Sequence, residues 1–253
     1  MKTTILLSIL GTAVIAAGAF YFFGKPTFDS PGNQPLPKTA PAVSKPWIEI
    51  VSPSVFEIKP DDDSKIRELK TGDELSSGVK IEAAKNGRAN IHFPDGSAAR
   101  FEPGTKFVLS EGTFNAQSEK LTVKISLVVG RVWSKIITLV TPDSLWEVKT
   151  ANAVATVRGT AFGTEFFTGN SRIFGAENSV LVAAVDPQTK EIIKGTERIV
   201  VPEKFVEVKN VDILKIKERP ESVEVKIIPA AIAREDFFKR NEAEDARIDE
   251  KIK

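Results

Sequence analysis

The chain has 253 residues, and 42% of them are hydrophobic, which is enough for a sizeable core in one or two domains. Its 35 basic and 34 acidic side chains nearly cancel, and this balance argues against the clustered basic surface that nucleic-acid binding requires. The absence of cysteine excludes disulfides, thiolate metal sites and cysteine nucleophiles.

Residues 1–24 are predicted to anchor the protein in a membrane. The run from Ile5 to Phe23 is uncharged and mostly apolar, and as a helix it is long enough to span about 30 Å of hydrocarbon. It ends in four aromatic residues, 20–23, as is typical of a membrane interface. The alternative is a cleaved signal peptide with Ala17-Gly18-Ala19 as its cleavage site. The length of the run and the aromatic residues after that site favour an uncleaved anchor.

A stalk and an all-β domain are predicted to follow the anchor. Residues 25–46 contain six prolines, which favour an extended polyproline segment that cannot pack a core. Residues 47–229 consist of short runs of alternating or continuous apolar residues separated by turn clusters. This pattern predicts an antiparallel β-sandwich or roll, or a β-helix-like stack, with Trp133 and Trp146 in its core.

Residues 230–253 change in character and are predicted to form a charged helix. They contain neither glycine nor proline, and oppositely charged side chains are spaced four residues apart, as in Glu235 and Lys239. The apolar positions make only a broken stripe. We therefore expect a solvated helix that docks loosely on the sheet or offers a surface to a partner.

Asp95-Gly96-Ser97 predicts a tight turn, because glycine tolerates positive φ and the Asp and Ser side chains bond their own backbone. Alternating apolar residues flank the turn on both sides, so it is expected to join two strands with one buried face. The only histidine, His92, lies opposite that apolar face and is expected at the surface.

This turn belongs to an ordered series of short motifs. They are the segment with Gly72, then Gly87-Arg88-Ala89, the turn at Asp95, Gly96 and Ser97, the pair Gly104 and Thr105, the segment of Gly130 and Val132, and finally Val157 to Thr164 with Arg158, Gly159, Thr160 and Phe162. The series resembles the FecR domain, a bacterial extracytoplasmic module, over about residues 69–185.

The last motif allows two interpretations. A glycine that interrupts a strand usually marks a bulge or a close approach of the backbone, so Gly159-Thr160 is expected to turn the chain and bring Phe162 into the core. The alternative is a ligand contact at Arg158. We favour structural roles for the motif residues as a group.

The resemblance implies a domain outside the cytoplasmic membrane, so the residues after 24 are expected on that side, in a single-pass membrane protein rather than a secreted form. Regulators of this family carry a cytoplasmic domain that contacts a sigma factor. Only Met1 to Thr4 precede the predicted anchor here, so direct sigma-factor control is not expected. A second departure is Asn178, where similar domains have glycine; asparagine also tolerates left-handed geometry.

No catalytic, metal-binding or cofactor-binding constellation emerges from the sequence, and the protein is not expected to be an enzyme. Two functions remain open. The first is a non-catalytic sensor or assembly module that binds another protein of the cell envelope. The alternative is a cell-surface scaffold that binds wall polysaccharide. A flat apolar patch or an unpaired sheet edge would favour the first, and an exposed aromatic platform in a groove would favour the second.

Overall fold

The computed structural model describes residues 45–59, 62–137, 141–157 and 159–252. The predicted anchor and nearly all of the predicted stalk lie outside the described residues. With 50% strand and 16% helix, the chain is mostly β, as predicted. No helix in the described part of the chain is long and apolar enough to cross a membrane.

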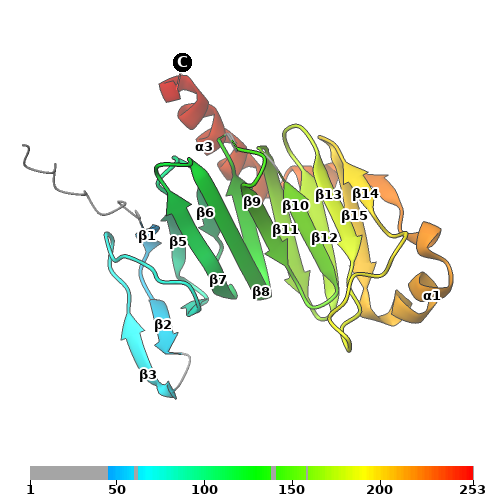
Figure 1. Cartoon of the computed structure of the whole chain (residues 1–253), viewed down its shortest axis with the longest axis horizontal. Helices are drawn as coiled ribbons and strands as arrows, with labels where there is room; N and C mark the ends of the chain where they lie inside the picture. Colours follow the sequence, from blue (N-terminus) through cyan, green and yellow to red (C-terminus); the bar gives the residue numbers. More distant parts are fainter. Residues whose placement is uncertain (1–44, 60–61, 138–140, 158, 253) are drawn as a thin grey trace, which may run out of the picture. The chain divides into compact units, whose positions relative to one another are not determined.

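The strands form one continuous mixed sheet that is folded into two layers, which we call sheet A and sheet B (Figure 1). In order across the layer, sheet B contains β3 (Asp62–Glu68), β2 (Val55–Lys59), β4 (Val79–Ala83), β7 (Lys106–Asn115), the first part of β8 (Lys120–Lys135), β9 (Leu145–Lys149), β10 (Ala153–Val157), β13 (Val180–Ala184) and β14 (Arg198–Val200).

Sheet A begins with a different set of strands and shares β8. In order, it contains β1 (Trp47–Ser52), β5 (Arg88–His92), β6 (Ala98–Phe101), the last part of β8, β11 (Ala161–Phe167), β12 (Asn170–Gly175), β15 (Lys204–Lys209) and β16 (Val225–Ile227). All described pairs are antiparallel except β8 with β9. The expected antiparallel sandwich or roll, or β-helix-like stack, is corrected to one mixed sheet, because at the β8–β9 pair the chain returns to the start of β8 after β8 has crossed to sheet A.

The bend of β8 joins the two layers. Up to Val129 the strand pairs with β7 in sheet B, and from Gly130 onward it pairs with β11 in sheet A. Gly130 has φ of +111°, a backbone conformation that residues other than glycine rarely adopt. The strand can therefore change layers without a break in its pairing.

The core lies between the two layers. Phe101 of sheet A stacks on Phe107 of sheet B with ring centroids 3.7 Å apart. Trp146 of β9 is fully buried, and its Nε1 donates a hydrogen bond to Ser134 Oγ of sheet A at 3.2 Å. Facing side chains from both layers thus interdigitate, as two packed sheets require. The core position predicted for Trp146 is confirmed.

A second apolar cluster lies on the outer face of sheet A, beneath helix α3 (Asp236–Ile252). Trp133, Gly163, Phe174 and Phe205 are cross-strand neighbours along one row of that face. Phe237 and Phe238 of α3 pack on them edge-to-face, at 5.0–5.8 Å between ring centroids. A Cβ atom on Gly163 would lie 3.2 Å from the Phe237 ring, so the glycine makes room for the helix.

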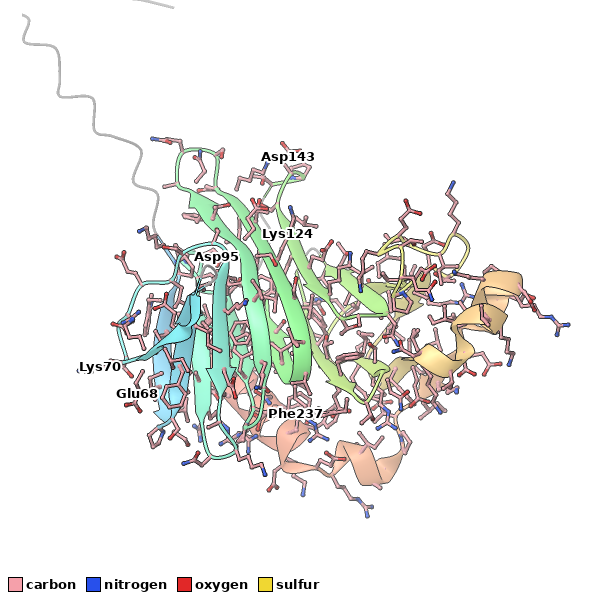
Figure 2. All side chains as sticks on the ribbon, turned by 90° about the horizontal axis from the view of Figure 1, so that it is seen from below. Glu68, Lys70, Asp95, Lys124, Asp143 and Phe237 are labelled. Atoms are coloured by element: carbon pink, nitrogen blue, oxygen red, sulfur yellow. The ribbon has the colours of Figure 1, made fainter. Side chains whose placement is uncertain are left out.

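The helix expected near the carboxyl end is present and docks on the sheet, but one of its faces is buried rather than solvated. Figure 2 shows α3 along the sheet, with Phe237 on the side that meets the strands. Phe237 and Phe238 are 2% and 3% exposed. Trp133 is completely buried as predicted, although it packs under this helix rather than between the layers.

A short helical insertion interrupts the region expected to be strand and turn. It contains η1 (Asn210–Asp212), α1 (Ile213–Glu218) and η2 (Pro220–Ser222), and α2 (Ala230–Ala233) precedes α3. Ile213 and Ile216, one helical turn apart, are buried, while Leu214 is 74% exposed. The alternating apolar residues of this segment mimic a strand in the sequence, but the buried pair follows the helical period.

Candidate functional site

The predicted motif residues stabilise turns and strand crossings. Gly72 has φ of +94°, and its amide donates to the Ile48 carbonyl at 2.9 Å, so this turn covers the outer edge of β1. Asp95 Oδ1 accepts from the Ser97 amide at 3.0 Å, and Gly96 has φ of +90°. The predicted turn between β5 and β6 is confirmed by these contacts and by the pairing of the two strands.

Gly104, Thr105 and Gly130 come together where β8 changes layers. Gly104 turns the chain with φ of +76°. The buried Thr105 hydroxyl donates to the Arg131 carbonyl at 3.2 Å and accepts from the Arg131 amide at 3.1 Å. A Cβ atom on Gly130 would overlap Thr105. Val132, two residues beyond Gly130, is completely buried. The two motifs therefore depend on each other.

The last motif forms the corner between β10 in sheet B and β11 in sheet A. Gly159 has φ of +121°, and the Thr160 hydroxyl donates to the Glu177 carbonyl. Phe162 is completely buried in the core, as predicted. Arg158 lies outside the described residues, and the interpretation of it as a ligand contact is untested. Asn178 adopts φ of +44°, so it meets the left-handed geometry expected of it.

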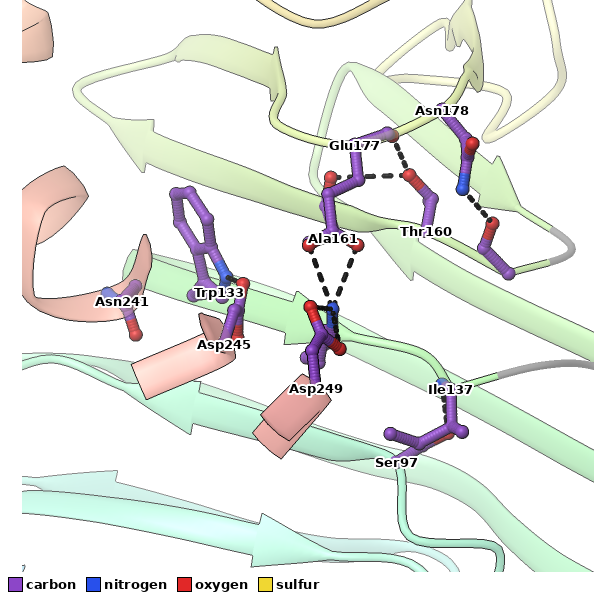
Figure 3. Close-up of polar contacts among 12 residues, drawn as sticks. Ser97, Trp133, Ile137, Thr160, Ala161, Glu177, Asn178, Asn241, Asp245 and Asp249 are labelled. Atoms are coloured by element: carbon purple, nitrogen blue, oxygen red, sulfur yellow. Dashed lines mark hydrogen bonds and ion pairs between the residues drawn. The ribbon is translucent and has the colours of Figure 1, made fainter. Parts of the chain in front are cut away.

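Two of these motifs meet at the end of β8. The Ile136 amide donates to the Thr160 carbonyl at 2.9 Å, and the Ile137 amide donates to Ser97 Oγ at 3.1 Å. Figure 3 shows both neighbourhoods around the same strand end. Gly72 and the Gly104–Gly130 crossing lie elsewhere, so the structure does not bring the whole series into one site.

The corner at Gly159 borders a hollow of about 480 Å³ on the outer side of sheet B. Its lining combines motif residues with exposed aliphatic ones: Thr156, Val157, Gly159, Asn178, Ser179, Leu181 and Ile199. Thr156, Leu181 and Ile199 are cross-strand neighbours on β10, β13 and β14. Leu181 is 48% exposed and Ile199 is 64% exposed. Among the described residues, no aromatic side chain lines this hollow.

The hollow opens beside an unpaired edge. β14 is the last strand of sheet B and pairs with β13 alone. An edge strand presents backbone donors and acceptors that another extended chain can use. The sequence indicated the motif residues of this surface, but Leu181 and Ile199 were not singled out, because an alternating strand does not reveal which of its faces stays uncovered.

A network of charged groups holds α3 on sheet A. Asp245 Oδ2 accepts from Trp133 Nε1 at 2.8 Å, and Oδ1 accepts from Arg100 Nη1 at 2.6 Å. Burial raises the pKa of the Asp245 carboxyl, against the opposing effect of Arg100. The Arg100 and Asp245 side chains are each 4% exposed, so the pair is nearly sealed from solvent.

Lys135 links this helix to the Gly159 corner. Its Nζ donates to Glu177 Oε1 at 2.8 Å and to Asp249 Oδ2 at 3.1 Å (Figure 3). Burial lowers the pKa of Lys135, but the hydrogen bonds to Glu177 and Asp249 outweigh it and raise the pKa overall. We interpret the network as structural, because each of these charged groups is paired with a group of opposite charge.

Little in the described part of the chain resembles a catalytic or metal centre. His92 Nε2 lies 2.8 Å from Glu49 Oε2, and its ring stacks on Trp47. The described residues contain no group of three or more His, Asp or Glu side chains that could hold a metal ion.

Comparison with known proteins gives one family match, over part of the chain. Residues 79–190 match the model of the family described as FecR protein. This segment is similar to the FecR domain. The resemblance suggested by the ordered motifs is therefore confirmed for this part of the chain. No curated protein matches the sequence.

Two solved structures are similar to part of this chain. Both are crystal structures, at 1.65 Å and 2.50 Å resolution, described as a candidate anti-sigma factor from Parabacteroides distasonis ATCC 8503. The first has 14% sequence identity and a TM-score of 0.42, and the second has 13% identity and a TM-score of 0.41. The matches cover 60% and 58% of this chain, and 58% and 57% of the respective relatives, so the match spans under two thirds of each.

Proposed function

We propose that this protein is a non-catalytic module of the cell envelope whose FecR domain binds another envelope protein, as a sensor or an assembly factor. In this proposal residues 1–24 anchor the chain in the membrane and the β-domain lies on the extracytoplasmic side. The match to the FecR family supports a regulatory role of this kind.

The observation that carries the proposal is the apolar hollow beside the unpaired edge of β14. Two large aliphatic side chains, Leu181 and Ile199, are about half exposed or more on adjacent strands. Exposed aliphatic groups grouped in this way commonly mark a protein–protein contact. The neighbouring edge can add a strand from the partner through backbone hydrogen bonds, with the side chains giving specificity.

The hollow does not suit a polysaccharide, because its lining offers aliphatic and small polar groups and no aromatic platform. The alternative function as a wall-binding scaffold would therefore need a different surface. A protein partner fits the chemistry of the hollow better, since burying Leu181 and Ile199 is favourable at about 25 cal/mol per Å² of apolar area.

Site-specific photo-crosslinking in intact cells tests this proposal. A photoreactive residue at Leu181 or Ile199 should give a discrete crosslinked protein, and the same residue at Leu214 should not. Leu214 is the matched control, because it is a large aliphatic side chain, 74% exposed, on α1 rather than on this edge.

The substitutions Leu181→Asp and Ile199→Asp should abolish capture of the same protein, whereas Leu214→Asp should leave capture unchanged. Equal crosslinking from all three positions would reject the hollow as a specific surface. A crosslinked product that survives both Asp variants would show that the contact lies elsewhere on the domain.

A further inference from the structure

A second surface lies on sheet A, beside the first half of α3. There a groove of about 160 Å³ runs between the helix and the strands β1, β5 and β6. Its principal polar lining residues are Glu49, Arg88, Asn90, Arg100, Arg240 and Glu244. At about 30 Å³ for each water molecule, the groove has room for about five waters, or for one ring-sized polar group.

Two hydrogen-bond donors in the groove residues lack a partner. Arg100 uses Nη1 to bind Asp245, but its buried Nη2 has no hydrogen-bond partner among the described residues. Arg88 Nη2 donates to Glu102 at 3.2 Å, and the buried Nε of the same guanidinium is likewise unpartnered. A buried donor left without an acceptor destabilises the folded chain. Both guanidinium groups therefore retain a donor that the described residues leave unused.

The charges of the residues that line the groove indicate which class of ligand it can bind. Three arginines, 88, 100 and 240, face three glutamates, 49, 102 and 244. Glu102 accepts from both Arg88 and Arg240, and Arg100 is paired with Asp245. With the positive charges already balanced, an anion gains little net attraction. A neutral group with several hydroxyls can accept from the arginines and donate to the glutamates.

An aromatic platform borders the groove. Trp47 stacks on His92 with ring centroids 4.3 Å apart and an angle of 19° between the planes. Trp47 is 39% exposed, and His92 contacts Glu49, which lines the groove. Trp47 and Glu49 are two residues apart on β1, so their side chains leave the same face of the strand. An aromatic face beside polar groups suits the apolar face of a sugar ring.

We propose that this groove and the Trp47–His92 pair form a binding site for a neutral saccharide. One ring occupies the groove and bonds Arg88 and Arg100, and the next ring packs on Trp47. The site lies on sheet A and shares no residue with the hollow at Leu181 and Ile199. It therefore does not depend on the proposed protein partner.

Titration calorimetry of the full-length protein tests the site, in a detergent without a sugar headgroup. The probes are three neutral tetrasaccharides, chitotetraose, cellotetraose and maltotetraose, and one anionic tetrasaccharide, tetragalacturonate. We expect at least one neutral probe to bind and the anionic probe to bind more weakly. Binding should also protect Trp47 from acrylamide quenching, while Trp133 and Trp146, both fully buried, contribute little to the change.

Variants then connect binding to these residues. Trp47→Ala and Arg88→Met should each weaken binding on the order of tenfold, the equivalent of about 1.4 kcal/mol. Arg88→Met keeps the aliphatic stem and removes the donors, which limits damage to the fold. Phe167→Ala is the control, because Phe167 is an aromatic residue, 41% exposed, that does not line the groove.

Each contrary outcome overturns the proposal. Binding of none of the neutral probes at millimolar concentration would remove the site. Tighter binding of tetragalacturonate than of the neutral probes would show that the site prefers an anionic saccharide. Unchanged affinity in both variants, with a thermal unfolding curve like that of the unmodified protein, would place the saccharide elsewhere.

Discussion

Asp245 is a buried carboxylate that joins α3 to sheet A through its hydrogen-bond partners. An isolated carboxylate at 3% exposure would cost several kcal/mol. Here the indole of Trp133 and the guanidinium of Arg100 both donate to it. Removing one partner of such a buried pair typically costs more stability than the intact pair contributes, because the other charge is left buried and unpaired. The three residues are therefore mutually dependent, although they lie on three different elements.

Glu165 on β11 gives a prediction at the same scale. Its side chain is 5% exposed, and it lies 2.7 Å from Arg131 Nε. Burial raises the pKa of Glu165 above its ordinary 4.5, despite the opposing effect of Arg131 and Arg172. A raised pKa in the folded state means that the folded chain holds this proton more tightly than the unfolded chain. The contribution of Glu165 to stability is therefore fully present at low pH and is lost as the pH rises through the raised pKa.

Urea unfolding from about pH 4 to about pH 7 checks this sign. The unfolding free energy of the unmodified protein, relative to Glu165→Gln, should fall as the pH rises. Glu207→Gln is the control with the opposite sign. Burial raises the pKa of Glu207, but the hydrogen bonds and positive charges of Arg172 and Lys209 together outweigh burial and lower the pKa overall. A relative stability that rises with pH for Glu165 would show that the arginines dominate there.

At the scale of elements, α3 marks where sequence reasoning failed and why. The face of this helix toward the sheet includes Phe237, Asn241 and Asp245, spaced four residues apart. Two of the three are polar, so the sequence indicates a solvated face. They are buried because Arg100 and Trp133 on the strands supply partners. A pattern of apolar residues alone cannot reveal a polar stripe that is buried by pairing with distant residues.

Local chemistry, by contrast, is readable from the sequence. The turn at Asp95-Gly96-Ser97 and the burial of Phe162 were predictable, since a turn depends on its own side chains and an alternating strand shows its apolar face. The hollow at Leu181 and Ile199 was not, because its exposure depends on which strand ends the sheet. The bend of β8 lies between these cases: Gly130 and Thr105 both stood in motifs, but their contact was visible only in three dimensions.

That bend yields a prediction for the element. Gly130→Ala introduces a Cβ atom that overlaps Thr105, in a backbone conformation with φ of +111°. Gly78→Ala is the matched control, because Gly78 also has positive φ, +86°, but nothing lies within 4 Å of the added atom. Backbone strain of about 1–3 kcal/mol applies to both variants. Gly130→Ala should lose clearly more stability than Gly78→Ala in urea unfolding, and equal losses would mean that the crossing relaxes around Thr105.

For the whole molecule, the same fold presents two surfaces of different chemistry. The last strands of sheet B expose aliphatic groups beside an unpaired edge, and the first strands of sheet A present polar groups beside an aromatic pair. Both surfaces need access to the components of the cell envelope if the proposals for them hold. The side of the membrane on which the domain lies is therefore the property on which both proposals depend.

The expected topology is a single span at residues 1–24 with the domain outside, and protease accessibility measures it. Protease added to intact spheroplasts should digest the chain after Lys25, because in the proposed topology the residues that follow the span from Ile5 to Phe23 lie on the extracytoplasmic side. Ile9→Arg together with Val14→Arg should impair insertion, at about 2.5–3.5 kcal/mol for each central charge. Ile9→Leu with Val14→Leu is the control that keeps the span apolar. A domain that is protected in spheroplasts and cut only after lysis would place it on the cytoplasmic side, out of reach of wall saccharides and of extracytoplasmic partners.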